Sequence, residues 1–355
     1  MNLRPSGYEP DELPGCSTPR KALARDVPRR QVCSNRGRNC EDRFARNCHN
    51  VVLVLPTACM VHKAHSSSDI ATRALADLLH DIVASGREPI ETPDIADAVA
   101  VHDLRKALKR WRAILRLIAP TVGDEAERMR VDARDLAREM ATARDGRAVQ
   151  EALADLGDGS PDLPTRSRAA VAERLARIGA SAEAASLTPT RKARISEMWT
   201  HAAGAIERWP VQRFDRTLAA IQLAATYRRV CAAIPDDWSK ASPEALHRFR
   251  QRVVEHRYQM ELVESLWPKL MRVWISEAQR LRDRLGAYQD LVVLRRLTEP
   301  HQPLARWRSR LAPLIAERQA AHMATAQRLT GRLFAEKPKA FRQRLISLWE
   351  HRAEG

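Results

Sequence analysis

Residues 101–117 form the stretch VHDLRKALKRWRAILRL, which decides the fold of this chain. Wound as an α-helix, with about 100° between successive residues, the stretch divides into two unlike faces. The apolar face, continued by one further residue, carries Leu104, Ala107, Leu108, Trp111, Leu115 and Ile118. The polar face, within an arc of about 80°, carries His102, Arg105, Lys109, Arg112 and Arg116. We therefore expect one face, including Trp111, to pack in a helical bundle and the other to meet an anion.

The composition predicts a helical protein with an anionic partner. Lys and Arg number 60 against 44 Asp and Glu, a formal net charge of +16. Such an excess favours polyanions, namely nucleic acid, polyphosphate or an anionic membrane surface. Only 13 glycines and 5% aromatic residues indicate a mostly helical chain. No run approaches the roughly 18 apolar residues of a membrane span, and the N-terminus lacks a signal pattern, so we expect a soluble, cytoplasmic protein.

Residues 1–65 differ in character from the rest of the chain. They are rich in Pro, Arg, Asn, Ser and Cys, show no sustained periodicity, and are predicted to form a disordered leader. Five of the six cysteines lie there, but no C-x-x-C pair occurs and we expect no metal site. Residues 66–352 are predicted to form one helical domain.

The boundaries of the helices follow from caps and prolines. The first helix is expected to begin at Asp69 behind the cap Ser68 and to stop at Gly86 and Pro89, and the helix around residues 101–117 is expected to end at Pro120. A long helix is expected from 123 toward 156. The other expected helices cover 165–185, 190–208, 211–234, 243–267, 269–298, 304–334 and 340–351. No stretch alternates with a period of two, so no sheet is expected.

The sequence contains an internal repeat. The segment LHRFR at 246–250 echoes VHDLR at 101–105, with an offset of 145 residues. Asp145 and Asp290 each follow the histidine of their copy by 43 residues. Equal spacing over such a distance predicts a duplicated helical unit, with repeat 1 at about 66–208 and repeat 2 at about 211–352.

The second copy carries fewer cations than the first. The position of Lys109 is occupied by Val254, and the position of Arg116 by Glu261. His256 takes the place of Trp111 on the apolar face. We therefore expect the first copy to supply more of the positive field.

Three motifs of the chain, VHDLRKALKRWR, LHRFRQRVVEHRY and LRDRLGAYQDL, resemble those of the CHAD domains, the conserved-histidine α-helical domain family. The resemblance covers about residues 66–352 and includes no CYTH domain. It implies an all-α fold of two pseudo-symmetric four-helix bundles that flank a basic groove. It also implies binding of inorganic polyphosphate, and it suggests a location on polyphosphate granules.

Carried over position by position, the resemblance implies two half-sites. His102, Arg105, Lys109 and Arg112 match the first motif of the family, and His247, Arg250 and Arg257 match the second. Val254 and Glu255 depart from the cations usual there, which weakens the second half-site. With the neighbouring cations of the first helix added, the predicted polyphosphate-binding residues are His102, Arg105, Lys106, Lys109, Arg112, Arg116, His247, Arg250 and Arg257.

Two alternative functions remain open. A nucleic-acid-binding protein fits the charge, but the sequence has no zinc-finger spacing, no aromatic-and-glycine RNA signature and no stacking residues on the cationic face. A phosphohydrolase of polyphosphate would need a phosphate loop or carboxylates for Mg²⁺, and the E-x-E triplet Glu125-Ala-Glu127 lies on a predicted helix. We therefore predict a non-enzymatic protein without cofactor or metal. Asp145 and Asp290 are expected to cap helices or to pair with basic residues.

Overall fold

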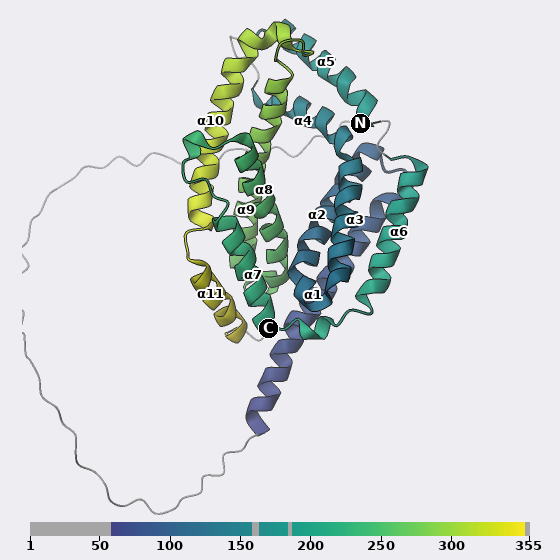
Figure 1. Ribbon diagram of the computed structural model, residues 1–355, viewed down its shortest axis with the longest axis vertical. Coiled ribbons are helices and arrows are strands. Elements are labelled where there is room, and N and C mark those ends of the chain that lie inside the picture. Colours follow the sequence, from purple (N-terminus) through teal and green to yellow (C-terminus); the bar gives the residue numbers. More distant parts are fainter. Residues whose placement is uncertain (1–57, 158–162, 184–186, 352–355) are drawn as a thin grey trace, which may run out of the picture. The chain divides into compact units, whose positions relative to one another are not determined.

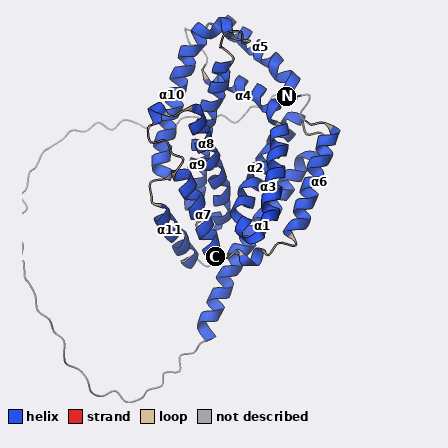
Figure 2. Ribbon diagram, in the orientation of Figure 1, coloured by secondary structure: helices blue, strands red, loops and turns tan. Residues whose placement is uncertain are grey.

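The computed structural model describes residues 58–157, 163–183 and 187–351, all of which belong to the unit Pro56–Gly355. Within these ranges the regular elements are helices, and none is a strand (Figure 2). The predicted leader lies outside the described residues except for 58–65, which are helical. The all-α fold expected from the sequence is confirmed.

The first bundle consists of α1 (Ala58–Glu91), α2 (Asp97–Val122), α3 (Asp124–Glu139) and α6 (Pro189–Ile206) (Figure 1). Helix α2 lies between α1 and α3, and α6 packs on α1. The expected apolar face of α2 is buried in this bundle, where the Trp111 ring stacks on Trp209 at 5.9 Å and meets Trp199 edge-on at 6.0 Å. Gly86 makes room for this cluster, because an added Cβ would lie 2.2 Å from the Trp199 ring.

The second bundle consists of α7 (Arg216–Cys231), α8 (Pro243–Met260), α9 (Pro268–Arg296) and α11 (Pro338–Glu350). Helix α8 begins as the sequence predicts, because the Ser242 side chain accepts a hydrogen bond from the Ala245 amide and Pro243 occupies the first turn. Tyr227 of α7 stacks on Phe341 of α11 at 4.3 Å. The apolar residues of both bundles form one continuous core, since α2 also packs on α8.

A smaller core lies beyond the two bundles. Helices α4 (Ala141–Asp155) and α5 (Thr165–Glu183) pack on each other, and α4 packs on α9. Helix α10 (Arg308–Leu333) runs along α9 into the same region (Figure 1). Asp155 ties α4 to α10, because it accepts bonds from Arg318 and from His322. The buried residues of this core include Val171, Leu175, Leu291 and Leu311.

The two halves of the chain contain helices in a parallel order. The contacts of α1 with α2 and with α6 correspond to those of α7 with α8 and with α11. The contacts of α2 with α3 and of α4 with α5 correspond to those of α8 with α9 and of α9 with α10. This order fits the predicted duplication, which stays a prediction.

Several predicted helix boundaries are wrong. Helix α1 begins at Ala58, so Ser68 lies inside it and is not a cap. Pro89 and Pro120 lie two residues before the ends of α1 and α2, where each removes one hydrogen bond without ending the helix. The single helix expected from 123 toward 156 is two helices that meet at Met140.

Candidate anion-binding groove

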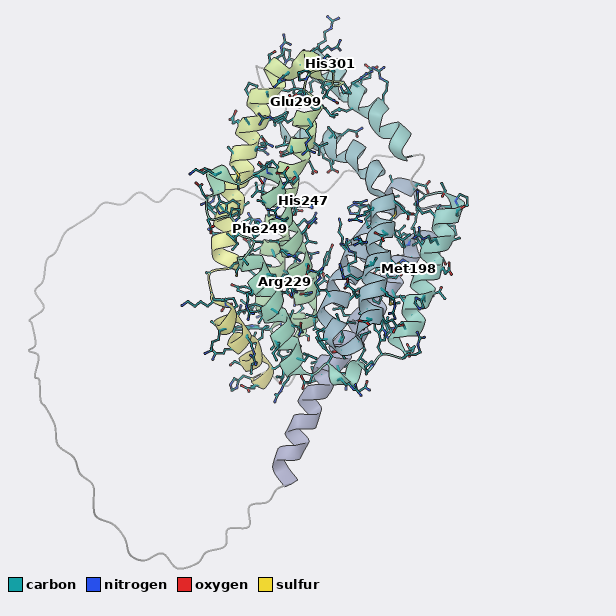
Figure 3. The ribbon with its side chains drawn as sticks, viewed as in Figure 1. Met198, Arg229, His247, Phe249, Glu299 and His301 are labelled. Atoms are coloured by element: carbon teal, nitrogen blue, oxygen red, sulfur yellow. The ribbon has the colours of Figure 1, made fainter. Side chains whose placement is uncertain are left out.

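A groove of about 1200 Å³ is lined by residues of α2, α3, α4, α8 and α9. Eleven of the lining residues are Lys or Arg, and six are Asp or Glu. Figure 3 shows side chains, including the labelled His247 of α8, in the space between the bundles. The structure brings all nine predicted site residues to this groove, namely His102, Arg105, Lys106, Lys109, Arg112, Arg116, His247, Arg250 and Arg257.

Arg112 is a half-buried cation of the groove that lies among other positive charges. Its guanidinium is half-buried, and its Nε is buried without a hydrogen-bond partner. In the described part of the chain no carboxylate lies within ion-pair distance of it. Burial lowers the pKa of Arg112, and the positive charges of Arg130, Arg116 and Arg134 act in the same direction. The site therefore favours the arrival of an anion at Arg112.

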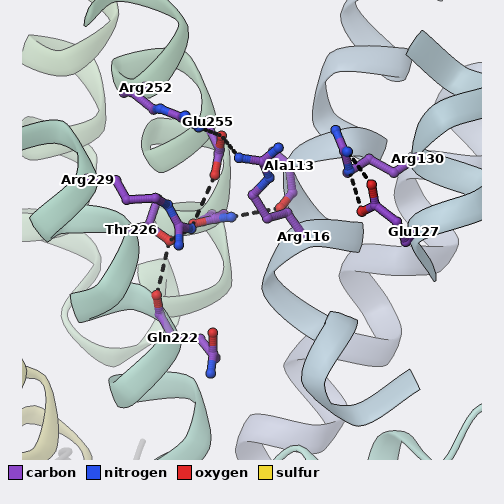
Figure 4. Close-up of polar contacts among 10 residues, drawn as sticks. Ala113, Arg116, Glu127, Arg130, Gln222, Thr226, Arg229, Arg252 and Glu255 are labelled. Carbon is purple, nitrogen blue, oxygen red and sulfur yellow. Dashed lines mark hydrogen bonds and ion pairs between the residues drawn. The ribbon is translucent and has the colours of Figure 1, made fainter. Parts of the chain in front are cut away.

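Arg116, one turn further along α2, has an internal partner. Its Nη1 lies 3.3 Å from Oε2 of Glu255 on α8. Arg252 and Arg229 reach the same carboxylate at 3.2 and 3.3 Å (Figure 4). Burial lowers the pKa of Arg116 in spite of the opposing effect of Glu255. Three arginines thus share one carboxylate.

Arg257, a predicted ligand, is largely committed to packing. Only 8% of the residue is exposed, its guanidinium lies 4.0 Å from the Tyr258 ring centroid, and its Nη1 lies 3.6 Å from Glu261. Glu261 also pairs with Arg110 at 3.0 Å, which joins the second bundle to the first. The carboxylate that replaces a groove cation in the second copy therefore holds the two bundles together.

Arg105 and Arg250 also brace neighbouring helices. Arg105 donates to the carbonyls of Ala137 and Met140 at 3.2 and 2.7 Å, where α3 ends and α4 begins. The guanidinium of Arg250 lies against Gly286 of α9, where an added Cβ would come within 3.4 Å of its Nε. Both side chains thus help to shape the groove that they line.

The remaining predicted residues are more accessible. His102, Lys106 and His247 are exposed, and Lys109 is partly buried. The Nε2 of His247 lies 2.9 Å from the Gln251 amide nitrogen, which donates to it. These side chains lie at the surface of the groove, where contact with a flexible ligand involves no loss of core packing.

The sequence analysis missed four groove arginines, namely Arg130, Arg252, Arg272 and Arg282. Arg272 and Arg282 belong to a stripe of α9 that faces the groove with helical spacing and comprises Arg272, Ser276, Gln279, Arg282, Gly286 and Asp290. The polar character of that stripe is a signal that could have identified the groove-facing side of α9. Asp290 lines the groove, whereas the side chain of Asp145 lies outside what the structure describes.

The described residues contain no group of three or more His, Cys, Asp and Glu side chains suited to a metal ion. The cysteines at positions 16, 33, 40 and 48 fall outside these residues. In the same part of the chain, no helix has both the length and the apolar character needed to cross a membrane.

These observations define an all-α protein with a basic groove between two helical bundles. The family model of the CHAD domain matches residues 73–299, more than half of the sequence, and the chain belongs to the CHAD domain family. It is also similar to the crystal structure of the CHAD domain from the plant Ricinus communis, with 21% identity and a TM-score of 0.45 over 79% of this chain and 92% of that one. Among curated proteins none matches.

Proposed function

We propose that the groove binds inorganic polyphosphate and that the protein does so without catalysis. The observation that carries the proposal is Arg112, a half-buried cation surrounded by other arginines and unpaired within the described residues. Phosphate oxygens accept paired hydrogen bonds from a guanidinium and supply the missing negative charge. A flexible phosphate chain can then follow the cations along α2, which recur about every 5 Å per helical turn.

The lining of the groove supports polyphosphate over nucleic acid. Single-stranded nucleic acids are held largely by bases stacked on exposed aromatic rings. Among the described lining residues Tyr258 is the one aromatic side chain, and it is 5% exposed beneath Arg257. Polyphosphate has no bases, so its binding does not depend on exposed aromatic rings.

The carboxylates of the groove support a binding role over a hydrolytic one. Asp155, Glu255 and Glu264 all form ion pairs with arginines. Although burial acts to raise the pKa of Asp155, hydrogen bonds from His322 and Arg318 hold it well below its usual value. These carboxylates are therefore occupied by internal cations.

As part of the same proposal, the protein resides on cytoplasmic polyphosphate granules. A fluorescent fusion of the protein tests this location.

The proposal is tested by titration of the full chain with long-chain polyphosphate, followed by fluorescence anisotropy. The variant Arg112→Gln should bind about tenfold to a hundredfold more weakly, because it loses charge-assisted hydrogen bonds worth about 1.5–3 kcal/mol. Lys339→Gln is the matched control, since it removes one exposed cation of α11 outside the groove lining. It should change the affinity by less than about twofold.

Two results would overturn the proposal. The first is displacement of bound polyphosphate by single-stranded or duplex nucleic acid at equal phosphate concentration, which would favour the nucleic-acid alternative. The second is release of phosphate from the chain in the presence of Mg²⁺, which would make the protein a phosphohydrolase. Weakening by salt does not separate the ligands, because both are polyanions.

A further inference from the structure

Glu255 is an acidic centre within the basic groove. Its side chain is 14% exposed and lies on α8 among arginines of three helices. Arg116 of α2 and Arg252 of α8 approach its Oε2, and Arg229 of α7 approaches its Oε1 (Figure 4). All three contacts measure 3.2–3.3 Å.

This arrangement resembles the surroundings of a bound phosphate group. Two oxygens of one anion receive guanidinium groups from three directions, as oxyanions do in arginine-lined sites. Arg229 is further oriented by its contact with the Thr226 hydroxyl, which in turn donates to the Gln222 carbonyl. The three arginines are thus positioned, and their positive charge is partly neutralised, before any ligand arrives.

Arg112 presents the opposite case on the same surface. It lines the groove one turn from Arg116 but has no carboxylate partner in the described residues. An incoming phosphate meets Arg112 directly, whereas it must compete with Glu255 for Arg116 and Arg252, which line the groove beside it. The positive charge available to a ligand is therefore smaller than the number of arginines suggests.

We propose that Glu255 is an internal competitor of the ligand, which lowers the affinity of the groove for short phosphate anions and so makes it selective for long chains. The inference rests on the proposed function. A short anion contacts Arg112 and its nearest neighbours on α2, while a long chain adds weak contacts along the whole face of α2 within one molecule. Chain length compensates for the cations that Glu255 withholds.

The test compares Glu255→Gln with the native protein, using tripolyphosphate and long-chain polyphosphate as separate probes. The variant keeps the size of the side chain but releases three arginines. We expect about tenfold tighter binding of tripolyphosphate, since a unit charge about 6 Å from a phosphate is worth about this factor at a dielectric constant between those of protein surface and water. Long chains should gain less, so the preference for long chains should shrink.

Glu264→Gln is the matched control. Glu264 lines the same groove and its replacement changes the net charge equally, but within the described residues it pairs with one arginine, Arg272, at 3.8 Å. Glu255→Asp is a second variant, which keeps the charge and should retain nearly native selectivity even where Glu255→Gln loses stability. Thermal unfolding of each variant verifies that it is folded.

The outcomes separate the inference from the proposed function. Native binding of long chains with no greater gain in Glu255→Gln than in Glu264→Gln overturns the inference and leaves the function standing. Binding of polyphosphate by Glu255→Gln but not by the native chain supports the competitor role and overturns the function of the native groove. Absence of binding by both overturns both.

Discussion

Helices α2 and α8 contain the same pattern of histidine and arginine, yet they use it differently. Arg112 of α2 faces the groove without a carboxylate partner in the described residues, whereas Arg257, its counterpart at the repeat offset, is covered by Tyr258 and paired with Glu261. Arg112 of α2 therefore offers its positive charge to a ligand, whereas Arg257 of α8 stabilises the packing of the helices. A motif that occurs twice does not imply two equal half-sites.

The contact between α2 and α8 explains the difference. Arg110 pairs with Glu261, and Arg116 pairs with Glu255. At the repeat offset of 145 residues, Arg110 corresponds to Glu255 and Arg116 to Glu261, so the two ion pairs are reciprocal. Identical copies would bring like charges together at a contact of this kind. Because α8 carries Glu255 and Glu261 where α2 carries Arg110 and Arg116, the two helices attract each other at this contact.

Glu261→Gln should have the largest effect on stability and would break this reciprocal contact. It leaves the largely buried Arg257 without its carboxylate, while Arg110 keeps Asp81 at 2.8 Å, and we expect a loss of about 3 kcal/mol in the free energy of unfolding. The corresponding change in α2, Arg116→Gln, should cost about 1 kcal/mol because that side chain is more exposed. Urea denaturation measures both. Equal losses in the free energy of unfolding would mean that the two ion pairs contribute equally to the contact between α2 and α8.

Arg257→Gln and Arg112→Gln should have opposite consequences. Loss of Arg257 removes a buried ion pair and a contact with an aromatic ring, so we expect a loss of about 2–3 kcal/mol in stability and less than about a threefold change in polyphosphate affinity. Loss of Arg112 relieves repulsion from Arg116 and Arg130, so stability should be unchanged or slightly higher while binding falls. Denaturation and binding are measured on the same preparations. The comparison fails if both variants lose mainly affinity or both lose mainly stability.

The sequence was sufficient to predict the features that depend on one helix. The apolar face of α2 is buried, Trp111 belongs to the core, and the nine predicted cations and histidines line one groove. The spacing within a helix determines the two faces of α2, whereas a groove shared by α2 and α8 was implied by the resemblance to the CHAD domains.

Features that depend on a partner residue from another helix could not be predicted from the sequence. The break at Met140 is stabilised by Arg105, which lies 35 residues earlier on α2. Glu255 was recognised as a departure from the motif, but its role depends on Arg229 of α7 and Arg116 of α2. No periodicity within α8 indicates which distant arginines meet there. The same is true of Arg130, which reaches the groove from α3.

The smallest predicted effect concerns the apolar faces of the two copies, where His256 of α8 takes the place of Trp111 of α2. His256 is fully buried among the rings of Tyr227, Trp274 and Phe341, and neither ring nitrogen has a hydrogen-bond partner among the residues that the structure describes. Burial, with a smaller contribution from Arg229, lowers the pKa of His256 from 6.5 to about 3. The histidine is therefore neutral in the folded protein and costs stability through its unsatisfied nitrogens.

His256→Phe should raise the free energy of unfolding by about 1–2 kcal/mol at neutral pH, because it removes two buried polar atoms without partners. The control is His322→Phe, which should destabilise the protein, since His322 is equally buried but bonded to Asp155.

The same substitution should also remove a pH dependence. The unfolded chain binds a proton at His256 below pH 6.5 while the folded chain does not until about pH 3, so the stability of the fold decreases as the pH falls below 6.5. The loss is about 1.4 kcal/mol per pH unit, or about 2 kcal/mol between pH 6.5 and pH 5. Denaturation at both pH values measures the free energy of unfolding of His256→Phe and of the native protein. The difference between the two proteins should be larger at pH 5 than at pH 6.5 by that amount. If that difference in free energy of unfolding is the same at both pH values, His256 is protonated or hydrogen-bonded within the fold. The apolar faces of α2 and α8 are then less alike than their burial suggests.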